Sequence, residues 1–344
     1  MKTNSPDLIK ITVLNPDGND PAQSFNDFAG EVGNGAHAPI NYHAYAACVG
    51  GFFENNCDQA IKRGHPVILL IRKRLKVVFK AVQQLKKAGI RVAVSFKETG
   101  FQQIAHQFQR PDKISLLKQI ISLADGCISS TEALVPFYRA LSLNPDNIVA
   151  FIPTPYPIDD SRWDFSIPLD QRRGIFLGTR DLELGSRNHF HAIVLLKYIS
   201  EKTNEPVTII NSNGRKGEKI IRSSGFKPDL IHVHKRLPYV EYLKLMAAHK
   251  LVFQLDHSFV PGQVAGDALL CGIVCIGGNS SIEEIGFPPS TRGRISQELV
   301  DYVISLVRSR ELQQALIDET RKSAMAGISF SAVAPKISQY FACL

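Results

Sequence analysis

Two stretches of the sequence combine glycines and charged side chains in a way that suits a phosphorylated ligand. In the first, an apolar run ends at Gly178, Arg180 and Arg187 flank the next few residues, and a helical pattern begins at Asn188. Glycines permit a tight turn, guanidinium groups bind phosphate oxygens in pairs, and a helix start offers free N–H groups. These four residues therefore predict a diphosphate-binding loop. The residues alone leave open the alternative of a solvated loop with incidental arginines.

The second stretch follows another apolar run and includes Asp256 and His257, a Pro-Gly turn at Gly262, and a short helical pattern that contains Asp267. A carboxylate near a helix start is favoured by the helix dipole, and from there it could accept hydrogen bonds from ribose hydroxyls. The alternative is that Asp267 only partners the dipole on a surface turn.

These side chains need strands that end at them and helices that cover the strands. Apolar runs typical of buried strands alternate with amphipathic helical patterns along most of the chain, which predicts parallel sheets of the α/β class. The expected strands are 9–14, 66–71, 90–96, 126–129, 148–152, 174–177, 207–210, 230–234, 251–255 and 273–276. The expected helices are 39–48, 75–88, 114–124, 132–141, 189–200, 239–248, 264–271, 297–326 and 331–341.

The alternation breaks in a proline-rich segment near 153–172, which can neither continue a strand nor start a long helix. We therefore expect two doubly wound, Rossmann-like domains, 1–155 and 173–330, joined by a linker over 156–172.

Composition and charge narrow the function classes. The 344 residues are 44% hydrophobic, enough for two packed cores, and the formal charge of +8 favours polyanionic partners. No apolar run is long enough to span a membrane, and residues 1–7 lack the apolar core of a signal peptide. The six cysteines form no Cys-x-x-Cys pair, which speaks against zinc and for reduced, packed thiols. We expect a cytoplasmic protein.

Several motifs are missing from the sequence. The dinucleotide fingerprint does not follow the first strand, and there is no phosphate loop ending in Gly-Lys-Ser/Thr. These absences speak against an ordinary oxidoreductase and a P-loop nucleotidase. No Asp-x-Asp ends a strand, so we expect no divalent metal at a nucleotide-sugar site.

The order and spacing of these residues resemble the second domain of GT-B-fold glycosyltransferases, in particular the retaining family-4 type (glycosyl transferases group 1). Gly262 matches the family's glycine, Asp267-Ala268-Leu269 its second Glu-Ala-Met, and Cys271-Gly272 its Cys-Gly. Gly178 with Arg187-Asn188 is similar to the family's phosphate loop. The resemblance covers roughly residues 148–278 and implies two domains facing across a cleft. It also implies a nucleotide-diphosphate sugar as donor, with no separate cofactor.

The sequence departs from the family pattern at the transferred sugar. Phe259 stands where the family has its first Glu, Asp267 replaces the second Glu, and Thr179 precedes Arg180 where the family has arginine. Asp256 and His257 are the nearest side chains that could replace the missing Glu, so both are predicted as catalytic.

In the first domain, Gly33 and Gly35 precede an expected helix and resemble the loop that brings acceptor and diphosphate to a helix start. Glu98 follows the strand 90–96, where an inverting enzyme would need a general base. An ordinary loop role is the alternative for each. Weaker candidates for the base are Asp17, His37 and His43. By the same resemblance, the terminal segment 331–344 is expected to pack back on the first domain.

A basic segment, residues 72–87, carries lysines largely off an apolar helical face. It either covers the sheet as a solvated helix or meets the anionic inner face of a membrane. Nucleic-acid binding is disfavoured, because no reader motif or interleaved aromatic residues accompany these charges.

The sequence therefore predicts a metal-independent hexosyltransferase that moves a sugar from a nucleotide-diphosphate sugar to a hydroxyl of a glycan or lipid-linked acceptor, in glycan or polysaccharide biosynthesis. Two alternatives remain: a nucleotide-sugar epimerase of the same fold, and a non-catalytic sugar-nucleotide-binding or scaffold protein.

Overall fold

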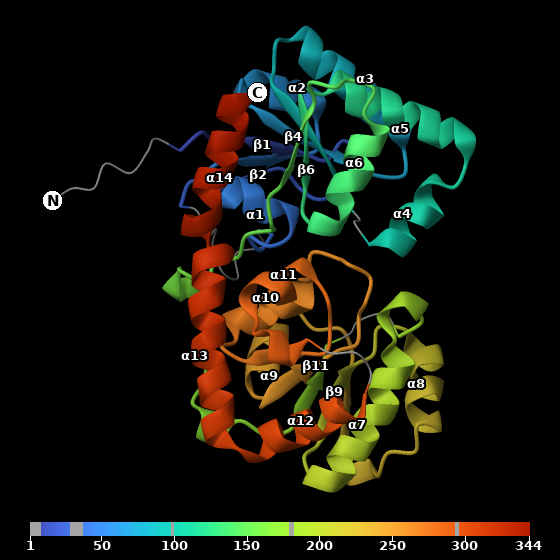
Figure 1. Cartoon of the computed structure of the whole chain (residues 1–344), viewed down its shortest axis with the longest axis vertical. Helices are drawn as coiled ribbons and strands as arrows, with labels where there is room; N and C mark the ends of the chain where they lie inside the picture. The colour runs from blue at the N-terminus through green and yellow to red at the C-terminus, as the bar shows by residue number, and fades with distance from the viewer. Residues whose placement is uncertain (1–7, 28–36, 98–99, 179–181, 293–295) are drawn as a thin grey trace, which may run out of the picture. The chain divides into compact units, whose positions relative to one another are not determined.

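The computed structural model describes residues 8–27, 37–97, 100–178, 182–292 and 296–344. The chain divides into two compact units (Figure 1). Unit 1 consists of Met1–Arg162, Phe259–Pro261 and Ile328–Leu344, and unit 2 of Trp163–Ser258 and Gly262–Gly327. Each unit is a largely parallel sheet covered by helices, so the predicted α/β class is confirmed.

The sheet of unit 1 has the strand order β2-β3-β1-β4-β5-β6-β7. All its neighbouring strands are parallel except β2 and β3, a short antiparallel pair that the sequence did not suggest. The strands are β1 (Thr12–Leu14), β2 (Gln23–Ser24), β3 (Phe52–Glu54), β4 (Val67–Ile71), β5 (Val92–Phe96), β6 (Gly126–Ser129) and β7 (Ile148–Phe151).

The central strand β4 shows why its sequence is apolar throughout. Val67, Leu69 and Ile71 belong to the core on one face of the sheet, and Ile68 and Leu70 belong to the core on the other. Successive side chains of a strand point to opposite faces, so a strand buried on both faces loses the apolar–polar alternation.

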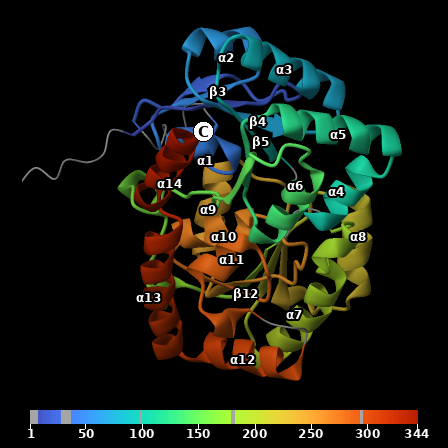
Figure 2. The ribbon, with the colours of Figure 1, turned by 45° about the horizontal axis from the view of Figure 1, so that its top comes forward.

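Helices cover both faces of this sheet. Residues of α2, α3, α4, α5 and α6 contribute to one core, and residues of α1 and α14 contribute to the other. Figure 2 shows α14 beside α1. The helices are α1 (Tyr42–Ala47), α2 (Cys57–Arg63), α3 (Leu75–Lys87), α4 (Phe101–Phe108), α5 (Pro111–Leu123), α6 (Val135–Leu141), preceded by the 3₁₀ turn η1 (Glu132–Leu134), and α14 (Phe330–Cys343).

The basic segment 72–87 contains α3. Its apolar residues Leu75, Val78, Val82 and Leu85 are buried in the core of unit 1, so α3 covers the sheet and presents lysines to solvent. Within the described part of the chain, no helix is long and apolar enough to cross a membrane.

The sheet of unit 2 is parallel, with the order β10-β9-β8-β11-β12. The chain runs from β8 outward to β9 and β10, then returns to β11 on the other side of β8. The strand order therefore switches direction between β8 and β11, the place where open α/β sheets bind ligands. The strands are β8 (Ile175–Leu177), β9 (Val207–Ile210), β10 (Ile231–His234), β11 (Leu251–Phe253) and β12 (Val274–Ile276).

The helices of unit 2 are α7 (His189–Thr203), α8 (Gly214–Ser223), α9 (Tyr239–Ala247), α10 (Gln263–Leu270), α11 (Ser281–Gly286), α12 (Gln297–Arg308) and α13 (Arg310–Gly327). The pattern over 297–326, expected as one helix, forms both α12 and α13. Ser309 ends α12 in an extended conformation, with φ of −110° and ψ of 115°. Its hydroxyl accepts a hydrogen bond from the N–H of Leu312 at 3.1 Å and so caps the start of α13.

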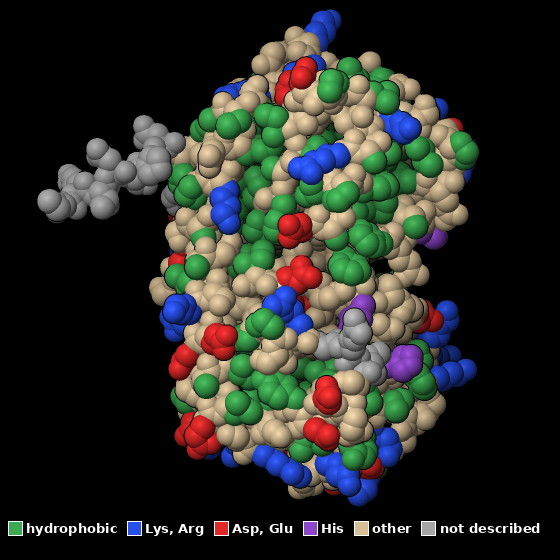
Figure 3. Space-filling model, in the orientation of Figure 1, with side chains coloured by type: hydrophobic (Ala, Val, Ile, Leu, Met, Phe, Trp, Pro, Cys, Tyr) green, Lys and Arg blue, Asp and Glu red, His purple; other side chains and the backbone are tan. Residues whose placement is uncertain are grey.

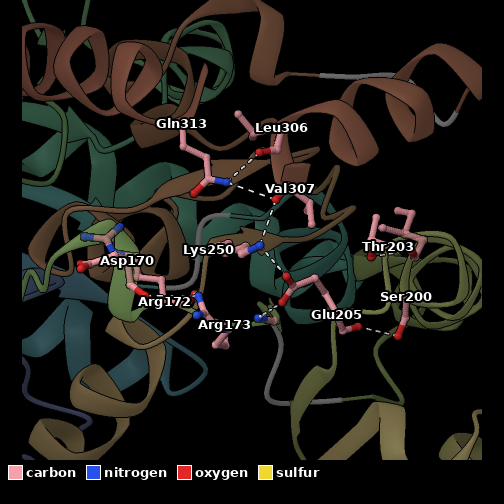
Figure 4. Close-up of polar contacts among 12 residues, drawn as sticks. Asp170, Arg172, Arg173, Ser200, Thr203, Glu205, Lys250, Leu306, Val307 and Gln313 are labelled. Carbon is pink, nitrogen blue, oxygen red and sulfur yellow. Dashed lines mark hydrogen bonds and ion pairs between the residues drawn. The ribbon is translucent and has the colours of Figure 1, made fainter. Parts of the chain in front are cut away.

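Partly buried charges hold the amino-terminal edge of this sheet together (Figure 4). The Lys250 ammonium forms an ion pair with Glu205 and donates to the carbonyl oxygen of Val307 at 3.1 Å. The Glu205 carboxylate also accepts the N–H of Gly174 at 2.6 Å. These contacts lie at the edge of the sheet opposite to its ligand-binding edge, so we assign them to stability.

Candidate functional site

The carboxyl-terminal edge of the unit 2 sheet brings the two predicted stretches together. Gly178 follows β8, Asp256 follows β11, and these strands are neighbours at the switch point. Arg187 Nε lies 3.6 Å from Asp256 Oδ2, and Asn188 Nδ2 donates to the carbonyl oxygen of Leu255 at 2.9 Å. Residues 67 positions apart in the chain thus form one polar group at the edge of the sheet.

Gly178 occupies a position that has no room for a side chain. A Cβ atom there would lie 2.6 Å from Val264 Cγ1 and 2.9 Å from Val252 Cγ1. Its N–H donates to the carbonyl oxygen of Phe253 at 2.9 Å. The end of β8 therefore packs directly against β11 and α10.

Asp256 holds the turn after β11 and faces the arginine. Its Oδ1 accepts the N–H of Ser258 at 2.9 Å and also the Ser258 hydroxyl, while Oδ2 faces Arg187. Asp256 is buried, whereas the Arg187 side chain keeps 22% of its surface exposed. Asp256 therefore lies where it can orient Arg187, whose side chain remains partly exposed. The predicted catalytic role of Asp256 stays a prediction. His257 Nε2 donates to the carbonyl oxygen of Gly277 at 3.1 Å.

The start of α7 lies directly after Arg187. Asn188 precedes the helix in the left-handed conformation, with φ of 52°, and its side chain makes no capping bond to the helix. Asn188 therefore does not cap the first turn of this 15-residue helix, and the positive end of the helix dipole lies beside Arg187. Burial and the nearby Arg187 lower the pKa of His189 to about 3, so His189 is neutral at pH 7.

Asp267 lies inside unit 2, which contradicts the alternative of a surface turn. Its side chain is in α10, the residue is 1% exposed, and its Oδ1 accepts the Tyr239 hydroxyl at 2.6 Å. Gly262 caps this helix with φ of 102°, and a Cβ there would lie 2.0 Å from Ser280 Oγ. Binding of ribose by Asp267 stays a prediction.

A third stretch, the turn 277–280 after β12 together with Glu283, supports the site and was missed in the sequence. The Glu283 carboxylate accepts the N–H of Ser280 at 2.9 Å and Gln254 Nε2 at 3.0 Å. Burial raises the pKa of Glu283. The backbone N–H of Asn279 donates to the carbonyl oxygen of Asp256 at 3.1 Å, which links this turn to the site. The signal in the sequence was a Ser-x-x-Glu capping box after two glycines.

Gly33, Gly35, Glu98 and Arg180 lie outside the described residues, so their roles stay predictions.

The weaker base candidates of unit 1 can be judged from their surroundings. His43 is 3% exposed and stacks on Phe53 with ring centroids 3.8 Å apart. Burial and the neighbouring His37 lower the pKa of His43 to about 2, which is too low for a general base near neutral pH. Asp17 accepts the N–H of Arg74 at 2.9 Å and forms an ion pair with its guanidinium group. The structure thus contradicts His43 as the base and gives Asp17 a structural contact.

Among the residues that the structure describes, no three His, Cys, Asp or Glu side chains are grouped so as to hold a metal ion.

No family model matches the sequence, and no curated protein matches it in sequence. Solved structures do match the fold. Anabaena HepE in complex with UDP and glucose aligns with 98% of this chain and 100% of its own at 14% identity and a TM-score of 0.62. E. coli trehalose-6-phosphate protein bound with UDP-2-fluoro glucose aligns with 80% of this chain and 73% of its own at 11% identity and a TM-score of 0.60. A UDP-forming trehalose-phosphate synthase from Burkholderia xenovorans aligns with 83% of this chain and 75% of its own at 12% identity and a TM-score of 0.56. The chain therefore has the GT-B fold, as predicted, while the assignment to family 4 stays a prediction.

Proposed function

We propose that the protein is a glycosyltransferase that moves a hexosyl group from a nucleotide-diphosphate sugar to an acceptor hydroxyl. The observation that carries the proposal is Arg187, which Asp256 orients at the start of α7 and at the switch point of the unit 2 sheet. The likeness to HepE with UDP and glucose, over nearly the whole chain, supports a uridine nucleotide as the first donor to test.

In this proposal unit 2 binds the donor. Arg187, Arg180 and the first-turn N–H groups of α7 would contact the diphosphate, as guanidinium groups and helix starts do. Gly178 would let the backbone approach it. Asp267, with Gly262 at the start of the same helix, is the proposed contact for ribose or the sugar.

Transfer requires that the acceptor oxygen bond to the anomeric carbon while that carbon's bond to the diphosphate oxygen breaks. The electron pair of the broken bond stays on the diphosphate, and the acceptor proton goes to a base, for which Glu98 and His257 are candidates. Negative charge grows on the leaving group, and Arg187 with the positive end of α7 would stabilise it. We propose that this cationic arrangement acts without a divalent metal, so added EDTA should leave turnover unchanged.

The acceptor would be a glycan or lipid-linked saccharide carried by unit 1, where Gly33 and Gly35 are the proposed loop. The protein would act in glycan or polysaccharide biosynthesis in the cytoplasm. The exposed lysines of α3 would attract it to an anionic membrane face by charge alone, because the apolar face of α3 is used in the core.

The test of the donor site is calorimetric titration with UDP, GDP and dTDP, followed by the same titrations on Arg187→Ala. Loss of a charge-assisted contact should weaken the preferred nucleotide about ten- to hundred-fold. Arg222→Ala, which removes an exposed arginine of α8, is the matched control and should bind like the wild type.

The outcomes separate the alternatives. If Arg187→Ala binds like Arg222→Ala, the diphosphate assignment is wrong, and if the wild type binds no nucleotide, both enzyme functions fail. Nucleotide release that depends on an added acceptor indicates a transferase. Conversion of the donor sugar without an acceptor indicates an epimerase, and binding with neither indicates a non-catalytic protein.

A further inference from the structure

The helix α8, the turn after it and the strand β10 form a strongly basic surface of unit 2. Residues 214–236, which we call the basic edge, contain seven Lys or Arg and two acidic residues, a net +5 out of +8 for the whole chain. All seven basic residues are exposed. In the described part of the chain, only Lys216 among them forms an ion pair, with Glu183 at 3.2 Å. Figure 3 shows Lys and Arg side chains along the side of unit 2 where Figure 1 places α8.

The strand β10 is the last strand of the unit 2 sheet and pairs on one side only. Its neighbour is β9, and among the described residues no other strand lies beside it. A free edge is commonly protected by charged side chains within the strand itself. The strand Ile231–His234 contains no Lys, Arg, Asp or Glu, and its Val233 is 46% exposed. This edge of the sheet can therefore still accept another strand.

The backbone of β10 has hydrogen-bonding groups that point away from the sheet. The carbonyl oxygen of His234 faces β9, because it accepts the N–H of Asn211 at 2.8 Å. The N–H and C=O groups of one residue in a strand point to the same side, and those of the next residue point to the other side. The N–H and C=O of Val233 therefore face away from β9, toward the position that an added strand would take.

We propose that the basic edge binds an extended acidic segment of a partner protein, which adds to the sheet beside β10. Outward N–H and C=O groups on an open edge match another strand, and such addition is a common mode of peptide recognition. The charge of the basic edge selects acidic segments, with Lys227 before β10 and Lys235 and Arg236 directly after it. The inference does not depend on the proposed function, because no residue of the basic edge is assigned to the donor site.

Three other occupants fit these observations less well. A second copy of this chain would bring one basic edge against another, which like-charge repulsion disfavours. Single-stranded nucleic acid is commonly held by stacking on aromatic side chains, and apart from histidine the basic edge has one aromatic residue, the half-buried Phe226. An anionic membrane would meet the charges but has no backbone groups to pair with the outward N–H and C=O of Val233.

The experiment measures the binding of fluorescein-labelled peptides to the full chain by fluorescence anisotropy. The acidic peptide has two glutamates at each end of a Val-Thr-Val centre, and the control peptide has glutamine in place of each glutamate. At an ionic strength of about 0.1 M, charges more than about 10 Å apart are largely screened, so nearby cations dominate. The acidic peptide should bind at least about ten-fold tighter than the glutamine peptide.

A charge-reversed pair tests the cations of the basic edge. Lys235→Glu with Arg236→Glu should weaken the acidic peptide about ten-fold and leave the glutamine peptide unchanged. Arg321→Glu with Lys322→Glu is the matched control, because it reverses one exposed Lys and one exposed Arg on α13 of the same unit. This control should bind the acidic peptide like the wild type.

A proline tests the backbone of β10. Val233→Pro removes the outward N–H and leaves the hydrogen bonds to β9 in place, because an edge strand tolerates proline where its N–H faces solvent. Val233→Thr keeps the N–H and the β-branched shape and is the matched control. Val233→Pro should bind the acidic peptide about three- to ten-fold more weakly than Val233→Thr. The fluorescence of Trp163, buried in unit 2, checks in urea that every variant is folded.

The partner's side can be tested without altering the protein. An acidic peptide with proline in place of its central threonine cannot continue as a regular strand, so it should bind more weakly than the original peptide. This comparison stands even where Val233→Pro does not fold.

The outcomes separate charge from strand addition. Failure of the wild type to bind the acidic peptide, or equal affinity for the acidic and glutamine peptides, would overturn the proposal. Equal weakening by the two charge-reversed pairs would overturn the role of the basic edge. If charge reversal weakens binding but the proline substitutions in the protein and in the peptide do not, the acidic peptide is held by charge alone and addition beside β10 is wrong.

Discussion

Replacing Gly178 by alanine should destabilise unit 2 and weaken nucleotide binding through one added methyl group. The new Cβ would lie 2.6 Å from Val264 Cγ1 and 2.9 Å from Val252 Cγ1. Both valines are buried, one on α10 and one on β11, so neither can move away without disturbing the core. The end of β8 must shift instead, and with it the switch point where β8 meets β11.

The expected size follows from overpacking of a closed core. An added methyl group that cannot be accommodated costs about 1–3 kcal/mol of the free energy of unfolding. For a unit of this size, that corresponds to a fall in melting temperature of roughly 2–12 °C. Gly185 is the matched control, because a Cβ there meets nothing within 4 Å and the residue is exposed. Gly185→Ala should stay within about 0.5 kcal/mol of the wild type.

The single tryptophan of the chain makes the assay specific to unit 2. Trp163 belongs to unit 2 and is 2% exposed, so its fluorescence reports the unfolding of that unit in urea. A second substitution, Val264→Ala, removes the methyl group that the new Cβ would meet. In the Gly178→Ala background it should therefore cost less than it does alone. The reasoning is refuted if Gly178→Ala unfolds at the wild-type urea concentration, or if the two substitutions are additive.

Three further predictions concern buried charge. Burial raises the pKa of Glu283 above its usual value of about 4.5. As pH rises from about 4.5 through the folded-state pKa, the free energy of unfolding of the wild type should therefore fall relative to that of Glu283→Gln. Urea titrations across this pH range measure both proteins, and a constant difference between their free energies of unfolding would contradict the prediction. The pKa of His43 is lowered to about 2, so stability is present above the unfolded-state pKa of about 6.5 and falls below it. In His43→Phe, the free energy of unfolding should fall less steeply with decreasing pH than in the wild type, by up to about 1.4 kcal/mol per pH unit. Acid-unfolding curves measure this, and a variant curve parallel to that of the wild type would refute the prediction. Lys250→Met should cost about 1–3 kcal/mol in urea unfolding, because it leaves the Glu205 carboxylate partly buried without its cation. Lys197→Met, which breaks a more exposed pair on α7, should cost under about 1 kcal/mol, and equal losses in the two variants would show that burial does not matter here.

Much of the fold could be predicted from local pattern. The expected strand over 126–129 matches β6, and the helical pattern over 75–88 differs from α3 by one residue. Such segments are set by apolar periodicity, which is a property of neighbouring residues in the chain. The short antiparallel strand β2 was missed because a strand of two residues is too short to show an apolar–polar alternation. The split of α12 from α13 was missed because Ser309 interrupts the backbone without interrupting the apolar pattern.

The sequence by itself placed Gly178 and Asp256 at the ends of apolar strands and Arg187 just before an expected helix, where a parallel sheet exposes its loops. Only the strand order put β8 beside β11, so that Arg187 faces Asp256, which lies 69 positions later in the chain, and strand order is a non-local choice. The same holds for Asp267, which any helical pattern would allow to face water. Its burial against Tyr239 depends on how α9 and α10 pack. The sequence therefore determined which side chains were available for chemistry, and the tertiary structure decided which of them meet, because contacts between distant segments depend on packing that no local pattern encodes.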